Sequence, residues 1–137
     1  MDKQYYPVEI EEKWSRIWSK RILSNKNSKT AFSQVIPPPN VTGTLHMGHS
    51  FQYAIMDFYT RYHHMAGKDA HWQVGADHAG IATQMVVENN LAKKDLTRHD
   101  LGREKFLDEV WSWKDYSEEK ITSQIKRLGC SVDWNKY

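Results

Sequence analysis

The sequence predicts an α/β fold with a parallel sheet, and three observations support this prediction. An apolar strand candidate at residues 31–36 precedes a long run of apolar residues at helical spacing, residues 47–65. A second strand candidate, residues 71–74, is followed by another helical run that reaches about Leu91. This alternation is typical of parallel strands joined by a crossover helix, with ligands bound beyond the carboxyl ends of the strands. We therefore expect the first half of a Rossmann-like, helix-rich nucleotide-binding domain.

An amphipathic helix is expected before the first strand. Pro7 suits a first helical position, and apolar residues recur at helical spacing as far as Trp18. Lys20 and Arg21 are expected to close this helix, and the polar run at residues 24–29 to form a loop.

The longest expected helix runs from Met47 to Met65 and ends near Gly67. One face of this helix is apolar, and its members are Met47, Phe51, Ala54, Ile55, Phe58, Tyr62 and Met65. Two further helices are expected downstream, one at residues 103–116 and a last one stopped by Gly129. We interpret these two helices as packing elements.

Length, charge and cysteine content limit the class of protein. The chain has 137 residues and a formal net charge of +2, so it has the size of one domain and lacks the overall charge of a nucleic-acid binder. Its one cysteine, Cys130, cannot form an internal disulfide. No segment approaches the roughly 20 apolar residues of a membrane span, and the N-terminus lacks the apolar core of a signal peptide. We expect a reducing, cytoplasmic setting without a membrane partner.

The chain is expected to divide into an N-terminal helical extension, residues 1–30, and the half-domain itself, residues 31–137. Six tryptophans combined with a mean hydropathy of -0.76 suggest a core whose outer faces pack against more protein. The last residues, GCSVDWNKY, form a turn followed by aromatic residues and no closing element. We therefore expect the sequence to be truncated.

The stretch PPPNVTGTLHMGH, Pro37 to His49, contains the main candidate binding residues. Three prolines exclude a regular helix or a central strand, and the long helix opens directly afterwards. A helix N-terminus attracts anions, and Gly48 removes a side chain that would block close approach. His46 and His49 lie about one turn apart, so both imidazoles can donate hydrogen bonds to charge developing on a phosphoryl group. The pattern predicts a phosphate site.

Simpler interpretations stay open beside this one. An H-x-x-H pair on a helix is often a chance or surface feature, and the glycine-rich turn could be an ordinary connection. With one cysteine, no H-E-x-x-H and no second ligand pair, we predict no metal site. His63 and His64 are most simply solvated residues near a helix end. Asp77 suits the N-cap of the following helix as well as it suits a binding role.

Three sequence blocks carry a resemblance to a known family. PPPNVTGTLHMGH resembles the HIGH-type motif of class I aminoacyl-tRNA synthetases, and GADHAGIATQ, beginning at Gly75, resembles the valine-specific members in particular. GREKFLDEVWSWKDYSEEKITSQIKRLGCSVDW is similar to the segment that precedes their editing insertion. The blocks occur in the right order and cover nearly the whole chain. The resemblance implies an N-terminal fragment of a valine-specific synthetase that ends before the editing domain.

The resemblance also implies roles for individual residues. His46 and His49 would be the catalytic residues that contact the phosphates of ATP, with the adenine packed against the backbone of Gly48 and His49. Asp77 would accept the amino group of valine, and His78 would shape the pocket. The implied ATP-binding residues are Pro39, Asn40, Val41, Thr42, Gly43, Thr44, Leu45, His46, Met47, Gly48 and His49. The implied amino-acid-binding residues are Pro38, Pro39, Asn40, Asp77 and His78.

The implied reaction has two steps and needs no protein nucleophile. The carboxylate of valine attacks the α-phosphate of ATP, which carries Mg²⁺, releasing pyrophosphate and leaving valyl-adenylate. A ribose hydroxyl of the terminal adenosine of tRNA(Val) then takes the acyl group. Catalysis would consist of positioning and stabilisation of phosphoryl charge.

The family also uses a KMSKS-type lysine loop, an editing domain and an anticodon-binding domain, and this sequence shows none of them. We expect the isolated chain to be inactive or very weak, and the complete enzyme to be a monomer. The alternative is a non-catalytic nucleotide-binding or tRNA-associated module. A purely structural role is the third candidate.

Overall fold

The computed structural model describes residues 4–18, 25–78 and 80–137 of the chain. It is helix-rich and contains a two-stranded parallel sheet. The chain forms two compact units, which are described separately. The first unit comprises Met1–Pro37, His46–Val74 and Ser123–Tyr137, and the second comprises Pro38–Leu45 and Gly75–Thr122. The predictions for Lys20, Arg21 and Ser24 lie outside the described residues.

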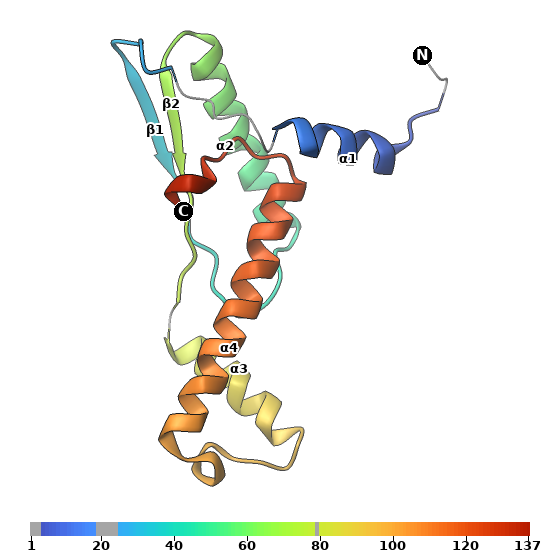
Figure 1. The fold of residues 1–137 in the computed structure, drawn as a ribbon, viewed down its shortest axis with the longest axis vertical. Helices are drawn as coiled ribbons and strands as arrows, with labels where there is room; N and C mark the ends of the chain where they lie inside the picture. Colours follow the sequence, from blue (N-terminus) through green and yellow to red (C-terminus); the bar gives the residue numbers. More distant parts are fainter. Residues whose placement is uncertain (1–3, 19–24, 79) are drawn as a thin grey trace. The chain divides into compact units, whose positions relative to one another are not determined.

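The first unit contains the predicted strand–helix–strand arrangement. Strands β1 (Ala31–Val35) and β2 (Asp69–Gln73) pair in parallel, and helix α2 (Met47–Met65) connects them (Figure 1). The pairing extends one residue past β1, because the Ile36 amide donates to the Gln73 carbonyl at 2.9 Å. Parallel strands require such a crossover connection. The predicted parallel pair is confirmed, although β2 begins two residues before the expected segment.

Two further elements of the first unit lie near its ends. Helix α1 (Pro7–Trp18) starts at the predicted proline, with Glu9 in its first turn. A short 3₁₀ helix, η1 (Trp134–Lys136), is capped by the Asp133 side chain. The buried apolar residues of this unit are Ile36, Tyr53, Ala70, Trp72, Val74, Ile125 and Val132.

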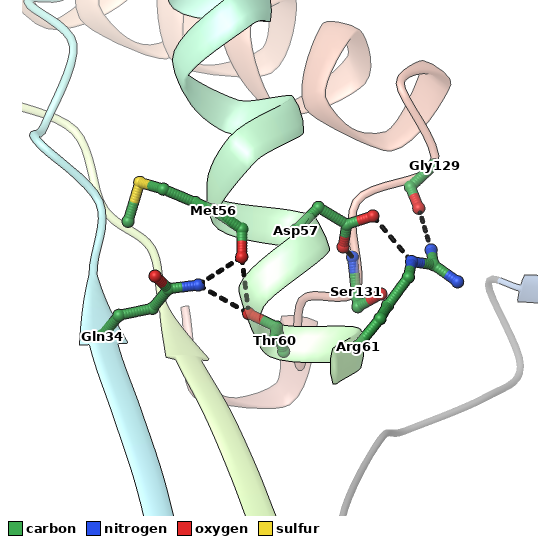
Figure 2. A network of polar contacts seen from close by, with 7 residues as sticks. All are labelled: Gln34, Met56, Asp57, Thr60, Arg61, Gly129 and Ser131. Atoms are coloured by element: carbon green, nitrogen blue, oxygen red, sulfur yellow. Dashed lines mark hydrogen bonds and ion pairs between the residues drawn. The ribbon is translucent and has the colours of Figure 1, made fainter. Parts of the chain in front are cut away.

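Helix α2 has the predicted bounds, but its predicted apolar face is not the buried one. Six large side chains of that face, from Met47 to Met65, are 43–85% exposed. The helix instead buries Tyr53 and Thr60. Gln34 of β1 donates to Thr60 Oγ1 at 2.6 Å and to the Met56 carbonyl, so polar groups satisfy one another at this contact (Figure 2). The side of α2 that meets the sheet therefore carries the buried Tyr53 and the hydrogen-bonded Thr60 instead of the apolar stripe.

A polar clamp holds α2 to the segment that follows the last helix. One oxygen of the Asp57 carboxylate accepts from the Ser131 amide at 2.6 Å, and the other accepts from Arg61 Nε at 2.7 Å. Arg61 Nη2 in turn donates to the Gly129 carbonyl at 2.8 Å, as Figure 2 shows. The two charged side chains thus bind two backbone groups while neutralising each other.

The second unit is built on helix α3 (Gly80–Ala92) and most of helix α4 (Arg98–Arg127). The backbone is not helical at Gly102, whose φ is 74°, so regular helix resumes at Arg103 as predicted. The expected break between residues 116 and 121 is wrong, because α4 continues through it. This stretch contains no glycine or proline, and the Lys114–Glu118 ion pair lies across its start.

Replacing Asp57 by Ala should lower the free energy of unfolding by about 1–3 kcal/mol, because the Ser131 amide and Arg61 both lose their acceptor. The measurement is urea unfolding of the chain. Asp108→Ala is the matched control, since Asp108 is an exposed helical aspartate. Equal unfolding midpoints for the two variants would contradict the structural role of the clamp.

Candidate functional site

The two histidines of the predicted phosphate site start helix α2 together. His46 is the N-cap, and its Nδ1 accepts from the Gly48 amide at 3.1 Å. His49 Nδ1 accepts from the His46 amide at 3.2 Å. This reciprocal arrangement is a capping box in which histidines replace the usual hydroxyl and carboxyl side chains. The structure therefore brings the two predicted catalytic residues into one motif.

The capping hydrogen bonds fix the tautomers of both rings. Because Nδ1 of His46 and of His49 accepts an amide proton, each neutral ring carries its own proton on Nε2. The ring centroids lie 3.9 Å apart. The pKa of His49 is lowered from 6.5, first by desolvation and second by the neighbouring His46. His49 is therefore mainly neutral at pH 7 and keeps an Nε2–H donor that the cap does not use.

Gly48 is required by the cap itself. A Cβ at this position would lie 2.9 Å from Cε1 and 3.1 Å from Nδ1 of the His46 ring. These distances are shorter than ordinary contacts, so any larger residue would displace the imidazole. The sequence suggested that Gly48 leaves room for a ligand, and the structure shows that it also leaves room for His46.

Behind the histidines, aromatic rings connect the helix start to the sheet. His49 lies 5.9 Å from the ring of Tyr53, which meets Trp72 of β2 edge-on at 6.3 Å. Tyr53 is fully buried, and burial, with a smaller effect of Cys130, raises its pKa to about 12. Tyr53 therefore remains a neutral, rigid support for the His49 ring.

In the second unit, the two predicted amino-acid loops pair with each other. Asn40 and Asp77 form an isolated parallel bridge. The Asp77 amide donates to the Pro39 carbonyl at 2.8 Å, and the Val41 amide donates to the Asp77 carbonyl at 3.1 Å. Pro39 is buried, whereas Pro38, Asn40, Asp77 and His78 are exposed. The predicted amino-acid-binding residues thus meet on a paired backbone that leaves most of their side chains accessible.

The N-cap interpretation of Asp77 can be compared with the start of α3. The described part of this helix begins at Gly80, and residue 79 lies outside the described residues. Asp77 precedes that position by two residues and belongs to the bridge with Asn40.

Helix α4 contacts both loops of the second unit, which the sequence analysis did not foresee. Trp113 Nε1 donates to the Val41 carbonyl at 3.1 Å, and Glu118 Oε1 lies 3.8 Å from His78 Nε2. Glu118 also pairs with Lys114, and this hydrogen bond raises the pKa of the lysine. The residues of these contacts lie far apart in the sequence, so no local pattern marks them.

Other ligand types find less support in the part of the chain that the structure describes. Among residues 4–18, 25–78 and 80–137, no three His, Cys, Asp or Glu side chains are grouped in a way that could hold a metal ion. None of the helices in these ranges combines the length and apolar character needed to cross a membrane.

The family model for class I tRNA synthetases of the I, L, M and V group matches residues 9–137. This match covers nearly the whole chain, including the capping histidines and the Asn40–Asp77 bridge. The chain therefore belongs to the class I tRNA synthetases.

The curated relatives of this chain include several valine–tRNA ligases. The chain is 56% identical to the valine–tRNA ligase of Acinetobacter baylyi over 133 residues. It is 52% identical over 139 aligned positions to the valine–tRNA ligases of Francisella tularensis and Neisseria meningitidis. These alignments cover 96–99% of this chain but only 14–15% of each relative. The chain thus spans about one seventh of the length of the relatives that it matches.

Replacing Gly48 by Ala should turn the His46 ring away from the Gly48 amide, because the new methyl group would overlap the imidazole. Stability should change little, since alanine favours the helix by roughly 0.5–1 kcal/mol while losing the cap costs about 1 kcal/mol. The measurement is the imidazole ¹⁵N chemical shift of His46, which reports on hydrogen bonding at Nδ1.

Gly43→Ala provides the control, because a Cβ at Gly43 would meet no atom within 4 Å. An unchanged His46 spectrum in Gly48→Ala would mean that the ring does not depend on this glycine.

Proposed function

We propose that this chain is the ATP- and valine-binding part of a valine–tRNA ligase, formed by the first half of its Rossmann-like catalytic domain. The observation that carries the proposal is the 52–56% identity to valine–tRNA ligases over nearly the whole chain. Within this proposal, residues 1–30 form an N-terminal extension, and residues 31–137 form the half-domain that precedes the editing insertion.

The ATP side of the proposed site is the turn from Pro39 to His49. The start of α2 offers the positive end of a helix dipole, to which phosphates bind readily. The capping box leaves the Nε2–H groups of His46 and His49 available, and both can donate to oxygen atoms of the phosphate chain. Neutral imidazoles suit this role, because they stabilise developing charge without taking part in a covalent step.

The amino-acid side is the paired backbone of the second unit. The exposed carboxylate of Asp77 would accept the ammonium group of valine in a charge-assisted hydrogen bond. Pro38, Pro39 and Asn40 would form a stiff wall beside the substrate, since proline fixes its own backbone. His78, which lies near Glu118, would complete the pocket.

The proposed reaction is the one that the relatives' name implies. The valine carboxylate attacks the α-phosphate of ATP and pyrophosphate leaves, which gives valyl-adenylate. A ribose hydroxyl at the end of tRNA(Val) then attacks the acyl carbon and AMP leaves. Mg²⁺ arrives with ATP as part of the substrate. Positioning and charge stabilisation supply the rate enhancement, so no nucleophilic side chain is needed. Remaining steps, including editing, would depend on parts of the ligase other than this chain.

In a complete ligase that contains this sequence, His46→Ala and His49→Ala should each lower the kcat of valine-dependent ATP–pyrophosphate exchange about 10²- to 10³-fold, because each removes a donor to developing charge. Because both histidines also cap α2, rates are normalised to active sites by adenylate burst. His46→Asn separates the two roles, since asparagine is a good N-cap but lacks the outward Nε2–H. Near-normal kcat in His46→Asn would remove His46 from the chemistry.

Replacing Asp77 by Asn in the same enzyme should raise the KM for valine more than the KM for ATP, because only valine presents a positive charge to this carboxylate. The measurement is exchange kinetics with each substrate varied in turn. Asp108→Asn, at an exposed helical position, is the charge-matched control. A valine KM equal to that of the control would assign Asp77 a structural role only.

A further inference from the structure

We propose that Trp113 is a positioning residue for the amino-acid side of the site. Its indole N–H holds the Val41 carbonyl and thereby fixes the paired backbone of Asn40 and Asp77. The proposal rests on the proposed function, because it assigns Trp113 to the part of the site that would bind valine.

The Val41 backbone is held from two directions. Its amide donates to the Asp77 carbonyl at 3.1 Å, and its carbonyl accepts from Trp113 Nε1 at 3.1 Å. The residue is 1% exposed, so water cannot replace a lost partner without a local opening. The Asp77 amide continues the series by donating to the Pro39 carbonyl at 2.8 Å. One indole therefore completes a chain of backbone hydrogen bonds that crosses both loops.

Trp113 is suited to this task because it comes from a different and regular element. It lies on α4, is half-buried, and stands 5.6 Å from the Tyr116 ring. Its ring also lines a cavity of about 320 Å³ together with Val87 and Leu91 of α3. The Tyr116 ring lies beside the indole, and the indole nitrogen has only one proton to donate. A helix that supplies a single, directed donor can set the position of a loop that has no regular structure of its own.

The position of Val41 affects one substrate more than the other. Asn40 precedes it in the chain, and Asp77 is hydrogen-bonded to it, so both proposed valine contacts move when Val41 moves. The proposed phosphate donors, His46 and His49, are fixed by their own capping box in the first unit. Loss of the indole donor should therefore weaken valine binding more than ATP binding, because Val41 also belongs to the proposed ATP turn while the phosphate donors are held separately.

Trp113→Phe is the sharpest test, because phenylalanine keeps an aromatic ring in the cavity wall while it removes the N–H donor together with the second ring of the indole. Trp111→Phe is the matched control, since Trp111 lies two residues away on α4 and is 60% exposed. Both variants are made in a complete ligase containing this sequence, and the KM values for valine and ATP are measured by pyrophosphate exchange, normalised to active sites.

We expect Trp113→Phe to raise the KM for valine about tenfold, less than the 10²-fold cost of a full 1 Å misplacement, with a clearly smaller rise in the KM for ATP. Trp111→Phe should leave both values unchanged. A merely structural role for Trp113 would lower the thermal midpoint or the fraction of active sites, but not the valine KM per active site.

Amide hydrogen exchange gives a second, independent measurement. The Val41 and Asp77 amides donate across the two loops, so their exchange should be faster in Trp113→Phe than in wild type and unchanged in Trp111→Phe. Faster exchange in both variants, or in neither, would overturn the inference.

The kinetic outcomes distinguish a failure of the proposed function from a failure of the role assigned to Trp113. A wild-type protein without valine-dependent exchange would overturn the proposed function and the inference together. An active wild-type enzyme in which Trp113→Phe and Trp111→Phe share the same valine KM would overturn the inference alone. An equal rise in both KM values would do so too, because it would show a general distortion of the site.

Discussion

The parallel pairing of β1 with β2 is the constraint on which the rest of the structure depends. Two parallel strands cannot be joined by a tight turn, so the chain must cross over, and α2 is that crossover. The same pairing makes both strands end at one edge of the sheet. The crossover helix that the pairing requires is also the helix whose start carries the two histidines.

Polar contacts act together with the buried Tyr53–Trp72 pair to hold α2 in place. Gln34 binds Thr60 and the Met56 carbonyl on the sheet side, and the Asp57–Arg61 pair binds residues 129 and 131. Hydrogen bonds are directional, so such contacts fix a helix in rotation and register more tightly than apolar packing does. This leaves the apolar stripe of α2 exposed, and an exposed stripe of this kind is typical of a surface that packs against further protein.

The sequence predicted the elements whose limits are set locally. The bounds of α2 are correct because His46 caps its start and Gly67 follows its last turn, and Pro7 marks the start of α1. Prediction from the sequence failed where contacts between distant residues determine which surface of an element is buried. Helical spacing identified the apolar stripe of α2, but only the partners of Thr60 and Asp57 determine which face is buried. The expected break in α4 was wrong because no residue there interrupts a helix.

The same distinction applies to the candidate site. His46, His49 and Asp77 could be selected from sequence because they stand beside prolines and glycines in short motifs. Trp113 could not, since it lies 72 residues from its acceptor in a segment that reads as ordinary amphipathic helix. Its indole can be recognised as a hydrogen-bond donor to the site only in the folded chain, where it lies beside the carbonyl of the buried Val41.

The spacing of the two histidines has a physical origin in the capping box. A serine or aspartate at position 46 would cap the helix as well as histidine does, but would offer no further donor to a ligand. Imidazole has two nitrogens, so one can satisfy the helix while the other faces outward. The three-residue interval is the distance between the N-cap and the third helical position, at which side chain and backbone can exchange hydrogen bonds.

Because the two histidines both cap α2 and offer donors to a ligand, the stability of the helix start depends on pH. Protonation of either ring would place a proton on Nδ1 and remove the acceptor on which the cap depends. Because the pKa of His49 in the folded chain lies below 6.5, the unfolded chain takes up this proton more readily as the pH falls. The contribution of His49 to stability is therefore present above that pH and declines below it. The form of the ring that holds the helix start together is thus the same neutral form that can donate to a phosphate.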